Sequence, residues 1–457
     1  MSPELVSILV LVLMFVIATI RPINIGVMAF VAALVVGLAY TDLAGDEIAE
    51  LFPGDLFVLL VGITFLFAIA QNNGTIDWIV GASVRAVGGR LVAIPWIMFV
   101  VAALMTAVGA VSPGAVAILA PVALTVGARY GISQMLMGLM VVHGAQAGGF
   151  SPISVYGVIV NGVVGGTDLP SNPIALFLAS LVANTVVGIV VFFVFGGRDL
   201  LRRGYVDPDT VEDHARADQR SEPVGGEAGG AGERSQPAGG ERRELTDERT
   251  RGEEPVTTLT RERSLTLVGL VVLAVAAVGF DLDVGLTAFA VALALYLVSP
   301  DAFRKALSGV AWSVVVLVGG VLTYVEVMQE IGTIDYVSNA VANLAAPLLV
   351  ALLLCYIGGV VSAFASSTAL LGSTIPLAVP FLQQGEIGAV AMIAAFAVST
   401  TIVDCSPLST NGALVLANSV GVDRDVMFRR LLAYGAVVVA VAPLLLWLAL
   451  VVPSAAG

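Results

Sequence analysis

Residues 148–157 read G-G-F-S-P-I-S-V-Y-G, and residues 403–412 read V-D-C-S-P-L-S-T-N-G. Each stretch interrupts a long apolar run. Proline removes one backbone hydrogen bond from a helix, and glycine accepts unusual dihedral angles, so we expect a helix to break at each stretch. Unwound backbone at membrane depth is stable only where it is buried in protein or lines a polar cavity. The two stretches therefore predict a membrane protein with two broken helices.

The composition agrees with this prediction. The chain has 457 residues, of which 58% are hydrophobic and 12% are charged, whereas ordinary soluble domains carry about 25% charge. Its apolar runs are long enough to cross a bilayer as helices and lack the alternation of a β-barrel, which predicts an all-α polytopic fold. The first run, which follows Met-Ser-Pro-Glu, is interpreted as a membrane helix rather than a signal peptide. The two cysteines lie in apolar segments and predict no disulfide framework.

The two broken segments belong to a longer internal repeat. The tetrapeptide G-T-I-D occurs at 74–77 and at 332–335, and residues 112–121 align with 367–376. Collinear matches of this kind predict two homologous halves, an arrangement typical of secondary transporters. Between the halves, residues 198–263 hold 28 of the 55 charged side chains among Gly, Pro, Ser and Gln. This composition predicts a disordered linker between a first membrane repeat at 1–197 and a second at 264–457.

The apolar runs predict five crossings and one re-entrant hairpin in each half. The hairpins are expected at about 91–127 and 344–382, and the broken helices at about 132–164 and 386–418. The other crossings are expected at 5–20, 24–40, 55–71, 174–196, 264–280, 284–299, 308–328 and 428–452. An odd number of crossings per half inverts the second repeat relative to the first. With this topology all 21 Lys and Arg residues fall on one face, which the positive-inside rule makes cytoplasmic. Both termini are then outside and the linker is cytoplasmic.

The hairpin tips and the breaks supply the candidate binding groups. A broken helix offers free carbonyls to a cation and free N–H groups, at a positive dipole end, to a carboxylate. The candidate substrate-binding residues are Ser112, Pro113, Gly114, Ser151, Pro152, Ser154, Ser366, Ser367, Thr368, Ser406, Pro407, Ser409, Thr410 and Asn411. The candidate coupling-ion residues are Ser112, Gly149, Ser367, Asp404 and Asn411.

Two ionisable groups inside apolar segments carry separate hypotheses. A carboxyl at membrane depth is functional by default, so Asp404 is a candidate cation ligand or proton carrier; the alternative is a helix-end cap that faces water. His143 is a candidate proton relay or substrate donor, and a packing histidine with satisfied ring nitrogens is the alternative. No Lys or Arg lies deep in a predicted crossing, so a bound dicarboxylate needs a co-transported cation to offset its charge.

Several stretches resemble the malonate/dicarboxylate carrier family. They are F-P-G-D-L-F at 52–57, A-I-A-Q-N-N-G-T-I-D at 68–77, the run from G-L-M-V-V-H-G to V-I-V-N-G at 138–162, and N-P-I-A-L-F-L-A-S-L at 172–181. The second half is similar, more loosely, to the wider superfamily that includes sodium–dicarboxylate symporters. This resemblance implies a homodimer, inverted repeats with re-entrant hairpins, and elevator-type transport coupled to Na⁺. The Ser-Asn-Thr tip signature of those symporters is incomplete here, since Ser366-Ser367-Thr368 lacks the asparagine, and H⁺ therefore stays an alternative coupling ion.

These features predict a prokaryotic inner-membrane transporter, not an enzyme, that moves malonate or a C4 dicarboxylate together with Na⁺ or H⁺. It needs no cofactor and no nucleic acid. The first alternative is a cation/proton antiporter of the same superfamily, with Asp404 as its proton carrier. A remote alternative is an intramembrane hydrolase, for which Ser151 with His143 is the obvious pair. Since the chain has no phosphate-binding loop, ATP-driven transport by this chain alone is excluded.

Overall fold

The computed structural model describes residues 2–21, 23–86, 90–204, 258–280, 282–298, 300, 306–333, 336, 347–363, 367–383 and 387–455. Within these ranges the chain forms helices and no β-strand, as its composition predicts. Most of the predicted linker (205–257) and the tip residue Ser366 lie outside the described residues.

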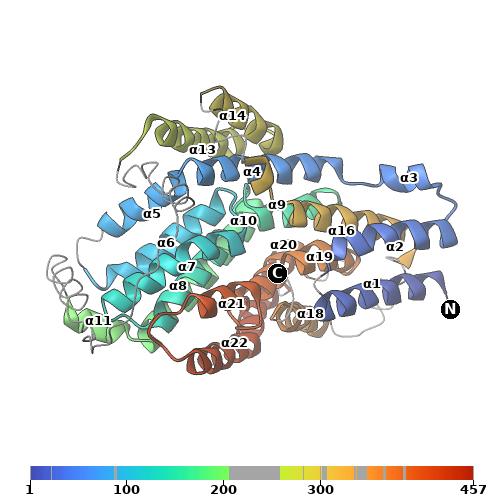
Figure 1. Ribbon diagram of the computed structural model, residues 1–457. Coiled ribbons are helices and arrows are strands. Elements are labelled where there is room, and N and C mark those ends of the chain that lie inside the picture. The colour runs from blue at the N-terminus through green and yellow to red at the C-terminus, as the bar shows by residue number, and fades with distance from the viewer. Residues whose placement is uncertain are drawn as a thin grey trace, which may run out of the picture.

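The first half holds the helices α1 to α11 (Figure 1). Their bounds are α1 Pro3–Ile20, α2 Ile25–Tyr40, α3 Gly45–Glu50, α4 Gly54–Asn72, α5 Thr75–Ala86, α6 Ala93–Ala107, α7 Ser112–Arg129, α8 Gln134–Gly148, α9 Val155–Gly165, α10 Pro173–Val194 and α11 Gly197–Arg203. Side-chain N-caps start several of them, namely Asn24 for α2, Ser133 for α8 and Asn172 for α10. The short helices α3, α5 and α11 lie outside the predicted crossings.

The second half holds the helices α13 to α23. Their bounds are α13 Arg261–Gly279, α14 Val284–Val298, a 3₁₀ turn Leu307–Gly309, α16 Trp312–Glu330, α18 Pro347–Ser362, α19 Ser367–Gln383, α20 Ala389–Ile402, α21 Thr410–Ala417, α22 Arg424–Leu446, a π-helical turn Trp447–Val451, and α23 Val452–Ser454. In this half, as in the first, a long apolar helix is split in two, here between α20 and α21.

Among the described residues, five helices are long and apolar enough to cross a membrane: α4, α7, α10, α16 and α22 with its continuation to Ser454. Seven shorter apolar helices accompany them, and the exposed hydrophobic side chains are spread over α1, α2, α10, α13, α14 and α22. Surfaces of this kind suit lipid rather than water. The chain is therefore a multi-pass membrane protein.

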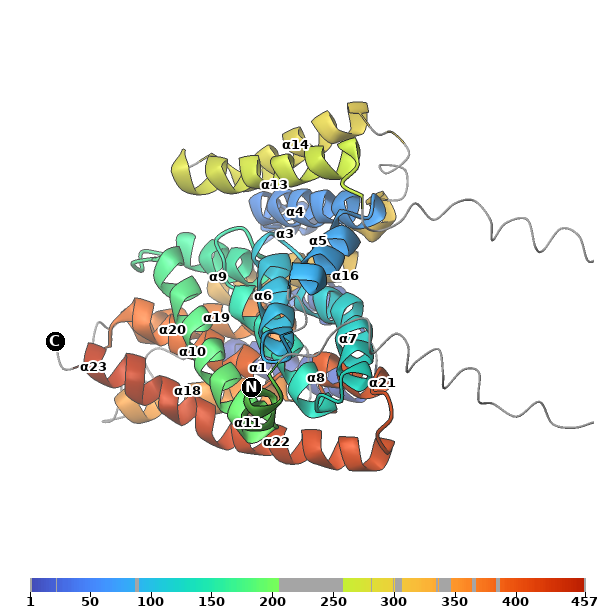
Figure 2. The same ribbon diagram turned by 90° about the vertical axis from the view of Figure 1, so that its left-hand side faces the viewer.

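Helix α8 lies at the centre of the molecule and is buried along its whole length. It packs against α6, α7 and α10 in its own half, and α20 packs in the same way against α18, α19 and α22. At one edge α13 and α14 stack on α4, and at the opposite edge lies α22 (Figures 1 and 2). Polar side chains on α8 and α20 are therefore held away from lipid.

Two glycine–glycine contacts join the halves at matching places. Gly26 of α2 lies against Gly320 of α16, and Gly62 of α4 lies against Gly285 of α14. A Cβ on Gly26 would clash with the Val316 carbonyl oxygen, and one on Gly62 would lie 2.5 Å from the Gly285 oxygen. Small residues let membrane helices approach closely enough for backbone contact, which replaces the hydrophobic effect as the source of stability.

Replacement of Gly26 by valine is expected to destabilise the protein, because the contact with the α16 backbone leaves no room for a side chain. Overpacking of this kind costs about 1–3 kcal/mol. Thermal unfolding of the detergent-solubilised protein measures the effect. The control is Gly54→Ala, since a Cβ on Gly54 meets nothing within 4 Å. Equal melting temperatures for the two variants would contradict the tight packing of α2 on α16.

The glycines that begin the repeated G-T-I-D tetrapeptides lie in equivalent turns. Gly74 ends α4 with a φ of 72°, and Gly332 ends α16 with a φ of 83°, a backbone conformation that favours glycine. Beside the first turn, Asn73 donates a hydrogen bond of 2.7 Å to Thr266 at the start of α13. At the second turn, the Thr333 hydroxyl lies 2.7 Å from that of Ser7 in α1. Each turn is therefore hydrogen-bonded to the first helix of the other half, the turn after α4 to α13 and the turn after α16 to α1.

The ends of the predicted linker are ordered for a physical reason. Residues 198–203 form most of α11, whose Leu200 is buried and whose Arg203 donates to the carbonyl oxygens of Tyr130 and Gly131. At the other end Thr260 caps α13. The first residues of the predicted linker are therefore helical, and the apolar pattern of α11 is too short to show this in the sequence.

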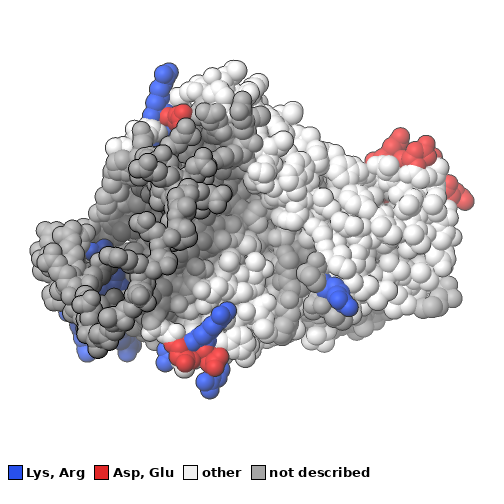
Figure 3. Space-filling view, in the orientation of Figure 1, with Lys and Arg blue, Asp and Glu red and all other residues white. Residues whose placement is uncertain are grey.

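Charge is segregated along the molecule. Acidic side chains gather at the end occupied by α3, where no blue side chain is seen in this view; other acidic side chains lie beside the blue ones at the lower and upper edges (Figure 3). The ordered ends of the linker, α11 and the start of α13, lie toward the opposite side from α3 (Figure 1).

Candidate functional site

The first break, at residues 149–154, is held open by serine side chains. Ser154 caps α9: its hydroxyl accepts a hydrogen bond of 3.2 Å from the Gly157 N–H and donates to the carbonyl oxygens of Gly149 and Ser151. Ser151 donates to the carbonyl oxygen of Ala107, at the end of α6. The hydroxyls thereby satisfy backbone groups that the break would leave unpaired.

The second break, at residues 403–409, repeats this local structure. Ser409 caps α21: its hydroxyl accepts from the Gly412 N–H and donates at 2.7 Å to the Ser406 carbonyl oxygen. In both breaks the loop folds back so closely that the following glycine has no room for a Cβ, because the carbonyl oxygen of Ser406 blocks Gly412 and that of Ser151 blocks Gly157. The conformation is therefore a property of the shared S-P-x-S-x-x-G pattern.

Asp404 lies in the second break and is 3% exposed. Asn411 donates to one of its carboxylate oxygens at 3.0 Å, Gln146 of α8 donates to the same oxygen at 3.4 Å, and the Asn411 N–H donates to the other at 3.4 Å. The hydroxyls of Ser367 and Ser409 also interact with this carboxylate. The partners of Asp404 are neutral groups drawn from both halves of the chain.

Each predicted hairpin tip contacts the broken helix of the other half. Ser112, at the start of α7, accepts a hydrogen bond of 2.9 Å from Asn411 of α21. The Tyr156 hydroxyl of α9 interacts with Thr368 of α19 and with Ser112. Helices α7 and α21 pack together, as do α19 and α9. We name the following group the central cluster: Ser112, Tyr156, Ser367, Asp404 and Asn411. Each of these side chains is at most 3% exposed.

His143 is buried in α8 with both ring nitrogens bonded. Its Nδ1 lies 3.0 Å from the Asn184 amide oxygen and its Nε2 lies 2.7 Å from the Tyr434 hydroxyl. These contacts tie α8 to α10 and α22, which is the packing role that the sequence left open. They also separate His143 from Ser151, whose hydroxyl bonds the Ala107 carbonyl, so the pair expected of a hydrolase is not formed.

The remaining predicted residues fall into two groups. Ser151, Ser154, Ser406, Pro407 and Ser409 are buried in the breaks, and Thr368 is buried beside Tyr156. Pro113 and Pro152 are half-buried, whereas Gly114 and Thr410 are exposed. Gly149 ends α8. The exposed pair was predicted from sequence adjacency, which does not reveal the phase of the helices α7 and α21.

Sequence reasoning missed two residues of the site, Gln146 and Tyr156. A buried amide in an apolar helix was the available signal for Gln146, because polar groups at membrane depth are commonly functional. The signal for Tyr156 was its position in the repeat, where it matches Asn411. Two supporting residues were missed in the same way as Gln146: the Ser180 hydroxyl donates to the Gln146 carbonyl oxygen, and the Asn184 amide donates to the Ser180 hydroxyl.

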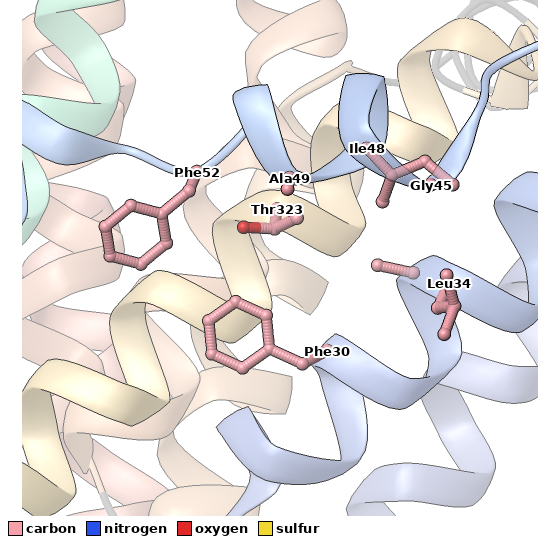
Figure 4. Close-up of a pocket in the computed structure, with 8 residues that line it drawn as sticks. Phe30, Leu34, Gly45, Ile48, Ala49, Phe52 and Thr323 are labelled. Carbon is pink, nitrogen blue, oxygen red and sulfur yellow. The ribbon is translucent and has the colours of Figure 1, made fainter.

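A separate cavity of about 340 Å³ lies between α2, α3 and α16 (Figure 4). Its lining is apolar apart from Thr323, whose hydroxyl is satisfied by the Gly319 carbonyl oxygen 2.8 Å away. None of the predicted site residues lines it. This cavity offers no group that would recognise a carboxylate.

The comparisons with known proteins agree with this architecture. Residues 1–149 match the family described as the dicarboxylate carrier protein MatC N-terminus. The resemblance predicted from the sequence is confirmed for this region. The two resembling stretches that extend to residue 181 reach beyond the MatC match. No match was found among curated proteins.

Among solved structures, the chain is similar to the crystal structure of the Alcanivorax borkumensis YdaH transporter, which is described as revealing an unusual topology. The TM-score is 0.55 at 13% sequence identity, and the match covers 98% of each chain. At this identity the likeness establishes a shared fold and nothing of the substrate. A carrier-type N-terminal third and the fold of a transporter together point to membrane transport.

Proposed function

We propose that this protein is a secondary active transporter that carries small dicarboxylates, malonate or C4 acids, across the prokaryotic inner membrane together with Na⁺ or H⁺. The observation that carries the proposal is the central cluster, where both hairpin tips and both broken helices meet around one buried carboxylate. The MatC match supplies the substrate class. The carrier match and the transporter fold favour a carrier over an enzyme.

An anion carrier of this kind needs positive charge, and the cluster has no Lys or Arg. The positive dipole ends at the starts of α9 and α21, with the hydroxyls of Ser112 and Ser367, would favour carboxylates. Donors alone do not offset two negative charges at membrane depth, so entry with a cation follows. Asp404 is the group that would hold a cation, which would remove its own negative charge from the site that the dicarboxylate enters.

The proposed mechanism is elevator-type alternating access by a homodimer of inverted repeats, with α6–α7 and α18–α19 as re-entrant hairpins. The matched caps of α9 and α21 and the matched contacts between hairpins and broken helices support the repeat. Length alone would also admit α7 as a crossing; its start at Ser112, inside the central cluster, favours the hairpin. The α3 end, where acidic side chains are seen without basic ones, supports external termini and a cytoplasmic linker (Figure 3).

The test is uptake of radiolabelled malonate and succinate into proteoliposomes, first with an inward Na⁺ gradient and then with a pH gradient alone. Saturable uptake with Na⁺ supports the symporter, and uptake driven only by pH supports H⁺ coupling. Absence of uptake under both gradients would contradict the dicarboxylate proposal.

Bulky side chains at the two Ser-Pro pairs are expected to stop transport. Ser151 and Ser406 are 5% and 4% exposed, and the Ser406 Cβ already lies 3.1 Å from where a Cβ on Gly435 would stand. Ser151→Phe and Ser406→Phe should each reduce malonate uptake to background. The matched control is Leu408→Phe in the second break, since Leu408 is 48% exposed. Normal uptake by both serine variants would show that neither break takes part in transport.

A cation/proton antiporter is the second candidate, because Asp404 is a buried carboxyl surrounded by neutral donors. Such a group can exchange a proton for a metal cation. Na⁺/H⁺ exchange by the same proteoliposomes, measured with an internal pH dye in the absence of dicarboxylate, would favour this function.

A further inference from the structure

The cavity between α2, α3 and α16 lies apart from the central cluster and has an apolar lining (Figure 4). The rings of Phe30 and Phe52, whose centroids are 6.1 Å apart, lie at one end, and Leu34 and Ile48 lie at the other. The hydroxyl of Thr323 is already bonded within its own helix. Apolar cavities of about 150 Å³ stay dry and take up small apolar ligands. This cavity has a volume of about 340 Å³, so it suits hydrocarbon rather than water.

The cavity lies at the depth of lipid acyl chains. Helix α2 is apolar along its length and ends at Tyr40, which is followed by Asp42, so this end of the helix marks the membrane surface. At a rise of about 1.5 Å per residue, Leu34 and Phe30 lie about 9 and 15 Å from that end along the helix axis. One leaflet of the hydrocarbon core is about 15 Å thick, half of the full core. The cavity therefore falls within a single leaflet.

The cavity is continuous with the lipid-facing surface of α2. Leu34 lines the cavity and is 44% exposed, and Val31, Val35 and Leu38 on the same face of the helix are between 55% and 60% exposed. On the α3 side, Ala49 lines the cavity and is exposed as well. An acyl chain can therefore enter sideways from the bilayer.

The rim of the cavity at the α3 end is acidic. The exposed acidic residues there are Asp46, Glu47 and Glu50 of α3 and Glu326 and Glu330 of α16. The sequence has no Lys or Arg between Arg21 and Arg85, and acidic side chains are seen without basic ones at this end (Figure 3). Because like charges repel, this rim disfavours an anionic headgroup and favours an ammonium group.

We propose that the cavity binds one acyl chain of a phospholipid whose headgroup carries an ammonium group and no net charge, the chemistry of phosphatidylethanolamine. The chain fills the space between the two phenylalanine rings and Leu34, and the ammonium group stays at the surface beside the carboxylates of α3. The bound chain thereby completes the packing around Ile48, through which α3 is buried against α2 and α16. This lipid site does not depend on which solute or ion the protein carries.

The experiment is native mass spectrometry of the purified full-length protein. The protein is first incubated in detergent with equal amounts of phosphatidylethanolamine and phosphatidylglycerol that have the same acyl chains. We expect one phosphatidylethanolamine per chain to remain after the detergent is removed. Its preference over phosphatidylglycerol should be about fivefold or more, as expected for one unit of charge near a charged surface.

Substitutions that fill the cavity should displace the lipid. Ala33 of α2 and Ala49 of α3 both line it, so Ala33→Phe and Ala49→Phe fill it from two different helices. Each variant should lose the retained lipid, and it should also lose the rise in melting temperature that added phosphatidylethanolamine gives the unchanged protein. The matched control is Val35→Phe, which places the same ring on the lipid-facing side of α2, outside the lining, and should keep both.

Three results would overturn the proposal: no lipid retained by the unchanged protein, equal retention by the alanine variants and Val35→Phe, or a preference for phosphatidylglycerol. Loss of a second copy of the chain in place of lipid, when the cavity is filled, would instead make this face an interface between protomers. Melting temperatures without lipid show whether each variant is folded. If Ala33→Phe does not fold, Ala49→Phe still gives the test, because Ala49 is exposed.

The headgroup is tested separately, without a change to the cavity. The double variant Asp46→Asn with Glu50→Gln removes two exposed carboxylates from the rim. It should still retain one lipid per chain, and its preference for phosphatidylethanolamine should fall about twofold or more. An unchanged preference would contradict recognition of the ammonium group by the acidic rim.

Discussion

Replacement of Asp404 by asparagine is expected to abolish cation-driven uptake while leaving the fold intact. Asparagine has the shape of aspartate, but it removes the only charge in the central cluster and places an amide against the NH₂ groups of Gln146 and Asn411. Each hydrogen bond to a charged group is worth about 1.5–3 kcal/mol, and each 1.4 kcal/mol is a factor of about ten. The initial rate of malonate uptake should therefore fall about 100-fold or more.

The matched control is Asp423→Asn. Asp423 is exposed and caps α22, where its carboxylate accepts from the N–H groups of Asp425 and Val426. Asparagine caps helices about as well as aspartate, so uptake and melting temperature should stay unchanged. If Asp404→Asn transported like Asp423→Asn at every Na⁺ concentration, Asp404 would have no part in coupling.

The two breaks can be predicted from neighbouring residues in the sequence, whereas the central cluster cannot. Glycine and proline act on the backbone locally, so the ends of α8 at Gly148 and α20 at Ile402 follow from nearby residues. The same holds for the caps Ser154 and Ser409, whose partners are three residues away. Local chemistry of this kind is legible in one sequence.

The contacts between halves are different in kind. Asp404 and Gln146 are 258 residues apart, and Ser112 and Asn411 are 299 apart. Which members of a polar stretch turn inward depends on the rotation of each helix against its neighbours. Thr410 was predicted in the site and is exposed, whereas Gln146 was not predicted and touches the carboxylate.

The crossings and the helix packing show the same distinction between local and long-range information. Apolar runs predicted the crossings because burial in lipid depends on composition. They did not predict α3 and α5, because short helices between crossings have no apolar run of their own. The Gly26–Gly320 contact was also hidden, since a glycine in an apolar helix has the same appearance whether it faces lipid or a second backbone.

A methyl group on Gly412 is expected to have the other large effect. The carbonyl oxygen of Ser406 occupies the place where a Cβ on Gly412 would stand, and the loop backbone at Cys405 lies close behind it. Gly412→Ala can be accommodated only if the second break opens, which would withdraw Asp404 from Asn411. We expect a loss of about 3 kcal/mol or more in unfolding free energy, as for other overpacked backbones, and no measurable uptake.

The same experiment can be done independently at the matching glycine of the first break. Gly157 stands against the Ser151 carbonyl oxygen in the same way, so Gly157→Ala should lower the melting temperature and uptake to a similar extent. Gly165→Ala, at the end of the same helix α9, meets nothing within 4 Å and is the control. The two breaks share their local geometry but only the second holds a carboxylate. If Gly412→Ala lost ²²Na⁺ binding and Gly157→Ala, still folded, retained it, the two breaks would share a backbone structure but only the second would take part in cation binding. Loss of neither stability nor uptake in either variant would mean that the folded-back loops are not the conformation of the working protein.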